Sequence, residues 1–302
     1  MNKIRRGNRE GSRLFGYLMV VPATLLLVVV SIIPLLDGVY LAFTNTNLNT
    51  GADAWVGIQN FVEIFQDSKF YQVFGFTILY AFAVVLFSYI LGMLIALLLN
   101  QDIRFRGVFR AIILAPWVVP PVVATITWSW LLNDKVGLIN TVLQNIGMIQ
   151  EPIYFLSDLT LVKGTVIAFG VWKSYPFMMI TLLAGMQSID GVLYEAAKID
   201  GCNSVKTLWY VIVPMLKPSL VSCALFQFMW TSNDFMGPLI YISDMPKYTN
   251  SIYLRMSMDG DVGFQWNRIL AMSLISIIPS LIVFFCAQDS FIDGIAAGGV
   301  KG

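Results

Sequence analysis

Two ionisable side chains, Lys173 and Asp234, lie within long apolar stretches of the sequence. A charge in the hydrocarbon core of a membrane is costly, so such a residue is expected to have a function. Gln227, Trp230 and Asp234 fall near one face of a helix by their spacing. Aromatic faces and side-chain hydrogen bonds together can bind a ligand rich in hydroxyl groups, such as a sugar. The residues expected to line a polar pathway are Trp172, Lys173, Tyr175, Gln227, Trp230, Asn233 and Asp234. A structural polar contact between helices explains them equally well, and both interpretations stay open.

A second group of residues lies in the segment 190–217, between two apolar runs. Residues 193–199 are good helix formers. Gly201 can end that helix in the left-handed conformation. Asn203 or Ser204 can then cap a second short helix.

The second short helix is expected to end at Pro214. Its apolar side chains are Leu208, Trp209, Val211 and Ile212. Two short helices of this kind can form an exposed knob that contacts a partner. They can equally form an amphipathic element that only rests on lipid. Composition does not separate these two interpretations.

Several kinds of catalytic and metal site are not expected. The sequence has no histidine, the commonest general base and metal ligand. Cys202, Cys223 and Cys286 have no close spacing, so they predict neither a disulfide framework nor a metal site. The sequence also lacks G-x-x-x-x-G-K-[ST], the loop that usually cradles nucleotide phosphates. We therefore expect no catalytic residue, no metal, no cofactor and no nucleic-acid partner on this chain.

The elements that position these residues follow from composition. Apolar residues make up 57% of the chain and charged residues 12%, about half of the roughly 25% usual in soluble domains. A bilayer core needs about 20 apolar residues in a helix. Six runs meet this need, at 14–36, 73–100, 111–133, 164–189, 218–243 and 269–288. The first is too long for the apolar part of a cleaved signal peptide, so we expect a retained helix.

The fold expected is therefore an all-α integral membrane protein with six transmembrane helices. A basic segment, 1–13, precedes a membrane domain, 14–289, and a tail, 290–302, follows it. The segment 190–217 connects spans four and five within that domain.

Lysine and arginine residues predict the orientation of the chain. Twelve lie on the side of the termini: Lys3, Arg5, Arg6, Arg9, Arg13, Arg104, Arg106, Arg110, Lys198, Lys206, Lys217 and Lys301. Six lie in the opposite loops: Lys69, Lys135, Lys163, Lys247, Arg255 and Arg268. Because positive residues favour the cytoplasmic side, we expect both termini and the segment 190–217 to be cytoplasmic.

The segment 190–217 resembles a known family signature. Glu195-Ala196-Ala197, three residues, Gly201, nine residues and then Val211-Ile212-Val213-Pro214 is similar to the EAA signature of binding-protein-dependent ABC import permeases. Val211 and Val213 stand where the family usually has isoleucine and leucine. Further stretches resemble the carbohydrate, or maltose-type, branch: Leu193 to Gly201, Phe105-Arg106-Gly107, Ala115 to Pro121 and Gly298 to Gly302.

The resemblance implies a function and a set of partners. Two permeases form the pore, two separate ATPase subunits bind ATP and Mg²⁺, and an extracytoplasmic binding protein delivers a sugar or glycoside. The chain is then a multi-pass permease of a bacterial inner membrane, surrounded by lipid, and not an enzyme. The residues assigned to ATPase coupling are Glu195, Ala196, Ala197, Gly201 and Pro214.

Two other functions agree with parts of the sequence. An ion-coupled secondary transporter would use Lys173 and Asp234 as a coupled charge site, but such folds usually contain two related halves and no repeat is visible. A membrane enzyme would need a cluster of acidic or histidine residues. The one acidic cluster, Asp190, Glu195 and Asp200, is explained better by the EAA spacing.

Overall fold

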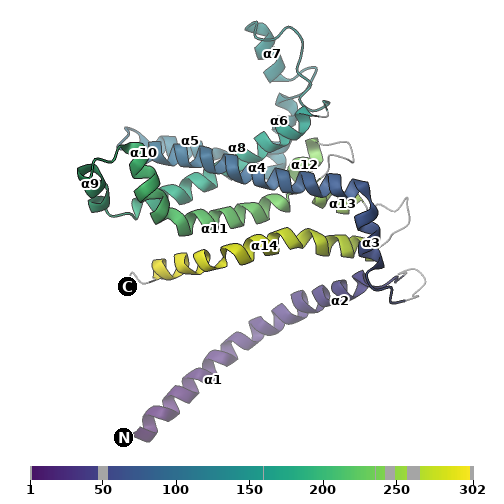
Figure 1. The fold of residues 1–302 in the computed structure, drawn as a ribbon, viewed down its shortest axis with the longest axis vertical. Helices are drawn as coiled ribbons and strands as arrows, with labels where there is room; N and C mark the ends of the chain where they lie inside the picture. The colour runs from purple at the N-terminus through teal and green to yellow at the C-terminus, as the bar shows by residue number, and fades with distance from the viewer. Residues whose placement is uncertain are drawn as a thin grey trace. The chain divides into compact units, whose positions relative to one another are not determined.

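The structure is a computed structural model that describes residues 2–46, 54–158, 160–234, 236–241, 249–256 and 266–299. Val300, Lys301 and Gly302, the end of the tail that resembles the family, lie outside these residues. The described part is helical, and its one strand-like pairing is an isolated bridge between Thr44 and Trp55. The prediction of an all-α chain is confirmed (Figure 1).

The chain divides into two compact units. The first comprises Met1–Asp67 and Ser257–Ile275. Its helices are α1 (Asn2–Leu27), η1 (Val28–Ile32), α2 (Ile33–Ala42), α3 (Gln59–Gln66) and the first part of α14 (Trp266–Gly299). Buried amides tie these helices together, because Asn60 and Asn267 both donate to the carbonyl oxygen of Thr44, at 2.9 and 2.7 Å. Arg268 and Asp67 add an ion pair at 3.0 Å.

The second unit comprises Ser68–Met256 and Ser276–Gly302. Its helices are α4 (Ser68–Leu99), α5 (Arg106–Val118), α6 (Pro121–Leu131), α7 (Leu138–Asn145), α8 (Leu161–Gln187), α9 (Gly191–Ile199), α10 (Ser204–Thr207), η2 (Leu208–Ile212), α11 (Val213–Ser232), α12 (Met236–Tyr241), α13 (Asn250–Met256) and the rest of α14.

Helices α4 and α8 form the centre of the second unit, and glycines let them approach closely. A Cβ atom at Gly92 would lie 2.8 Å from that of Met178, and one at Gly170 would lie 2.7 Å from a methyl group of Val84. Small residues at such crossings are typical of packed membrane helices. Apolar side chains of α4 and α8 then fill the core on both sides of the crossings.

Five helical segments of the described chain are long and apolar enough to cross a membrane, and a bent pair makes a sixth if it is one span. The bent pair is α5 and α6, which together cover most of the expected third run, 111–133, and begin five residues before it. They meet at 93° around Val119 and Pro120. The third run is therefore not one straight helix, and its prolines are the reason.

Two wide helical turns also come from prolines. The π-helical segments η1 and η2 are each followed, after one residue, by a proline, Pro34 or Pro214. A proline ring clashes with the carbonyl four residues earlier in an α-helix, and a wider turn relieves the clash. The expectation that the helix ends at Pro214 is wrong, since it continues into α11 as far as Ser232.

Candidate functional site

A cavity of about 380 Å³ lies within the second unit, lined by α4, the bend between α5 and α6, α8 and α11. Four of the seven residues predicted for a polar pathway line it: Lys173, Gln227, Trp230 and Asp234. The cavity thus brings together predicted residues of the fourth and fifth apolar runs. The volume of the cavity is within the range of small-molecule sites.

The other three predicted residues do not line this cavity. Trp172 packs edge-on against Trp128, with ring centroids 5.3 Å apart. Tyr175 donates to a backbone carbonyl of α5 at 3.3 Å. Asn233 is exposed and donates to the carbonyl oxygen of Met229 in its own helix, at 2.8 Å. These side chains therefore serve packing and helix ends in the structure.

A chain of hydrogen bonds in the wall of the cavity links α8 to α11. The amide nitrogen of Gln227 lies 2.7 Å from the hydroxyl of Ser174 and 2.8 Å from that of Thr231. Gln227 and Thr231 are only 5% and 4% exposed. Buried polar groups are normally hydrogen-bonded, and this chain satisfies that need while keeping polar groups at the cavity. Trp117 and Trp230 add aromatic surface beside it.

Asp234 is held by α4 and by its own loop. The hydroxyl of Tyr80 donates to one carboxylate oxygen at 2.9 Å, and the backbone N–H of Gly237 donates to the other at 3.2 Å. Tyr80 is 1% exposed and lines the cavity. Sequence reasoning missed Tyr80. The available signal was a tyrosine in the interior of an apolar run, away from the membrane interfaces where tyrosine is usual.

Lys173 bonds to the backbone at the bend between α5 and α6. Its ammonium donates to the carbonyl oxygens of Pro116, at 2.7 Å, and Trp117, at 3.2 Å. It also donates to the carbonyl oxygen of Val119. Lys173 and Asp234 line one cavity but form no ion pair with each other, although the structure describes both. The coupled charge pair that a secondary transporter would need is therefore not formed.

The segment 190–217 begins with a capped helix and a sharp turn. The Asp190 carboxylate accepts from the backbone N–H of Val192 at 3.0 Å, which caps α9. Gly201 has a φ of +77°, as predicted for a left-handed cap. Of the two candidates for the next cap, the structure has Asn203, which accepts from the N–H of Lys206 at 2.9 Å.

Helix α9 has one buried and one exposed face. Ala197 is 6% exposed and faces inward, whereas Glu195 and Ala196 are exposed. Ile199 is 85% exposed and Val192 64% exposed, so the outer face has apolar as well as charged character. Exposed apolar patches commonly mark contact surfaces.

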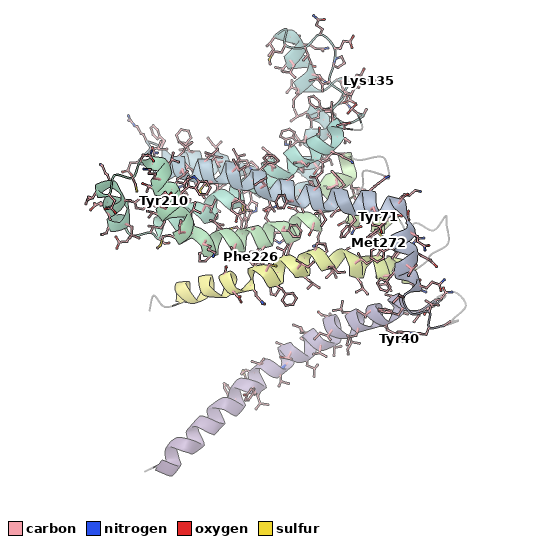
Figure 2. All side chains as sticks on the ribbon, in the orientation of Figure 1. Tyr40, Tyr71, Lys135, Tyr210, Phe226 and Met272 are labelled. Carbon is pink, nitrogen blue, oxygen red and sulfur yellow. The ribbon has the colours of Figure 1, made fainter. Side chains whose placement is uncertain are left out.

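The segment that follows α9 continues as an unbroken helix into the membrane domain. From α10 the chain runs without a break through η2 into α11, where Pro214 lies in the first turn. Ile212 and Leu216 are buried and pack with Met186 of α8. Tyr210, labelled in Figure 2, points outward from η2 and is 75% exposed. Tyr194 is the side chain of α9 that packs against this same cluster.

Residues 88–292 match the family of binding-protein-dependent transport system inner membrane components. The chain belongs to this family. The permease is 33% identical to the trehalose/maltose transport system permease protein MalF of Thermococcus litoralis, over 68% of this chain and 69% of that protein. It is 29% identical to the sulfoquinovosyl glycerol transport system permease protein SmoG of Agrobacterium fabrum, over 78% of this chain and 76% of that protein.

The permease also shares its fold with a solved transporter. It superposes on a chain of a bacterial ABC transporter involved in the import of the acidic polysaccharide alginate, with a TM-score of 0.79. The superposition covers 96% of this chain and 99% of that chain, at 20% identity. This likeness concerns the fold alone.

Several predictions are confirmed by the family. The permease is an inner-membrane, multi-pass subunit of a binding-protein-dependent ABC importer. It is a transport component and not an enzyme. As a member of this family it works together with a binding protein.

Proposed function

We propose that this permease takes a carbohydrate from the binding protein and passes it to the cytoplasm through the cavity between α4, α8 and α11. The observation that carries this proposal is the buried chain of Ser174, Gln227 and Thr231 beside Trp117 and Trp230. Hydroxyl and amide groups next to aromatic rings match the hydroxyls and the apolar faces of a sugar.

The hydrogen bonds already made by Lys173 and Asp234 favour an uncharged sugar as the substrate. The three N–H groups of Lys173 have three backbone carbonyls as partners, and Asp234 accepts from Tyr80 and Gly237. A neutral sugar can enter without displacing either set of bonds. Transport of trehalose and maltose by a relative 33% identical supports the same substrate class.

We further propose that α9 is the coupling helix that docks on the ATPase. Its capped ends, its exposed apolar side chains and its packed connection to α8 and α11 support this role. The residues involved are Glu195, Ala196, Ala197 and Gly201, with Pro214 at the entry to the membrane helix. The complete transporter then has a second permease and two ATPase subunits. The excess of lysine and arginine on one side favours cytoplasmic termini.

The substrate class can be tested on the complete transporter in proteoliposomes, with its binding protein. ATP hydrolysis would be measured with a panel of neutral mono- to tetrasaccharides, including trehalose and maltose, and with amino acids and inorganic ions. We expect stimulation by at least one neutral sugar. Stimulation confined to the amino acids or ions would contradict the proposal.

The role of the cavity can be tested with Gln227→Leu. This change keeps the size of the side chain but leaves the hydroxyls of Ser174 and Thr231 without their shared partner. We expect uptake of the stimulating sugar to fall about tenfold or more, while the complex still assembles. Ser222→Ala is the control, because that hydroxyl bonds within α11 and lies outside the cavity. Full uptake by Gln227→Leu would refute the route.

A further inference from the structure

The bend in the third apolar run follows from two missing hydrogen-bond donors. In a continuous α-helix the carbonyl of Pro116 would accept from residue 120, and that of Trp117 from residue 121. Both of those residues are prolines, which have no backbone N–H. The sequence itself therefore leaves two carbonyls of α5 without helical partners, at a point within the membrane.

These two carbonyls are the ones that Lys173 reaches from α8. The ammonium nitrogen lies 2.7 Å from the carbonyl oxygen of Pro116 and 3.2 Å from that of Trp117. It also donates to the carbonyl oxygen of Val119. A lysine ammonium has three N–H groups, so the donors and the acceptors match in number. The positive charge also suits the carbonyl end of a helix, which carries a partial negative charge.

We infer that Lys173 replaces the two amides that Pro120 and Pro121 lack, and that it thereby fixes the bent wall of the cavity. Lys173 is in this view a positioning residue and not a substrate ligand. Its importance for sugar transport rests on the proposed function, whereas its contribution to the bend does not.

The surroundings of the bend explain why a substitute donor is needed. Trp117 is 49% exposed and Val118 73% exposed, and both lie in a bent helix pair that is long and apolar enough to cross a membrane. Lipid offers no donor, so a carbonyl without a partner there is strongly unfavourable. Lys173 supplies donors from inside the protein and is itself half-buried. The wall formed by residues 117–121 then faces the cavity in one defined shape.

A double-mutant cycle tests this inference. Lys173→Met removes the donors and keeps the length of the side chain. Pro120→Ala with Pro121→Ala restores the two amides. We expect Lys173→Met to lower the unfolding temperature of the purified complex by about 5 °C or more in the natural background. We expect less than about a third of that shift when both alanines are present. Equal shifts in the two backgrounds, or no shift in the natural one, would overturn the inference.

Lys173→Arg gives a second test that does not depend on the proline variants. Arginine keeps a positive charge and several N–H donors, so we expect it to retain at least about half of the stability lost in Lys173→Met. It should restore sugar uptake in the same measure. An arginine variant as unstable as the methionine variant would contradict the inference. A rise in KM for the sugar in Lys173→Met with unchanged stability would instead make Lys173 a substrate ligand.

The stability cycle and the uptake assay separate the two proposals. Non-additive stability together with absent sugar uptake in the natural protein would uphold the role of Lys173 and refute the sugar pathway. In the variant with all three changes we expect a folded complex with at least about tenfold lower uptake, because restored amides favour a straighter wall. Natural uptake by that variant would show that the bend is not needed for transport.

Discussion

At the scale of single residues, the two charged side chains of the cavity are each engaged by a different element. Lys173 of α8 bonds to the end of α5, and Asp234 bonds to Tyr80 of α4. Each charge therefore links helices to one another, and neither neutralises the other. The uncharged polar groups of Ser174, Gln227 and Thr231 line the same cavity.

Tyr80→Phe tests the contribution of α4 to this arrangement. The change removes only the hydroxyl that donates to Asp234 at 2.9 Å. We expect a loss of about 1–3 kcal/mol in the free energy of unfolding, because a half-buried carboxylate loses a donor. Thermal or denaturant unfolding of the detergent-purified complex would measure it. Tyr40→Phe, at a tyrosine that is 49% exposed, is the matched control. Equal stability of the two variants would refute the role of Tyr80.

The sequence identified some of these residues and could not identify the rest. Lys173 and Asp234 stand out because a charge in an apolar run is rare. Ser174 does not stand out, because single hydroxyl groups are common in membrane helices, and Tyr80 offers only the weaker signal of a tyrosine inside an apolar run. Their role depends on which side chains of other helices they meet, and that contact comes from tertiary packing. Asn233 drew attention through its neighbours, yet its amide bonds within its own helix.

At the scale of elements, prolines and glycines set the shapes that matter. The π-helical turns before Pro34 and Pro214 and the bend at Pro120 are each located by a proline. Gly201 turns the chain between α9 and α10 with a positive φ. The positions of such features can be read from the sequence. Their outcome cannot, since one proline widens a continuing helix and another divides a helix at 93°.

Gly201→Ala tests the turn after α9, and Gly191→Ala is its matched control. A Cβ atom at either glycine would meet no atom within 4 Å, but only Gly201 has a positive φ. A left-handed conformation is about 1–2 kcal/mol less favourable for alanine than for glycine. We expect Gly201→Ala to weaken sugar-stimulated ATP hydrolysis several-fold and Gly191→Ala to leave it unchanged. Equal activity of the two variants would show that the turn does not contribute to coupling.

The helices of the structure depart from the expected apolar runs by several residues. The second run, expected at 73–100, corresponds to α4, Ser68–Leu99. The helix after Asn203 was expected to stop at Pro214 but continues, because a π-helical turn absorbs the steric clash of the proline. Steric relief of this kind depends on backbone geometry that residue types alone do not specify.

At the scale of the whole molecule, three parts of the second unit are proposed to act together in transport. A cavity suited to a sugar lies between α4, α8 and α11, a bend held by Lys173 forms one wall, and α9 lies beyond the end of α11 opposite to α12 (Figure 1). Family membership supplies a binding protein as partner, and the ATPases are part of the proposed function. ATP hydrolysis can move the sugar only if α9 transmits the ATPase motion to these helices.

The most direct test of this account is whether α9 is needed for the permease to bind the ATPase. The measurement is the amount of ATPase chain that co-purifies with the permease in mild detergent from its native host. Wild type would be compared with Ile199→Asp on α9 and with Val136→Asp before α7. These two positions are similarly exposed, at 85% and 81%, so each variant adds one charge to an open apolar site.

We expect wild type and Val136→Asp to retain the ATPase, and Ile199→Asp to lose it about tenfold or more, because a charge would be buried in the contact. Sugar uptake should fall in parallel. Full retention of the ATPase by Ile199→Asp, or its absence from the wild-type preparation, would contradict the assignment of α9 as the coupling helix.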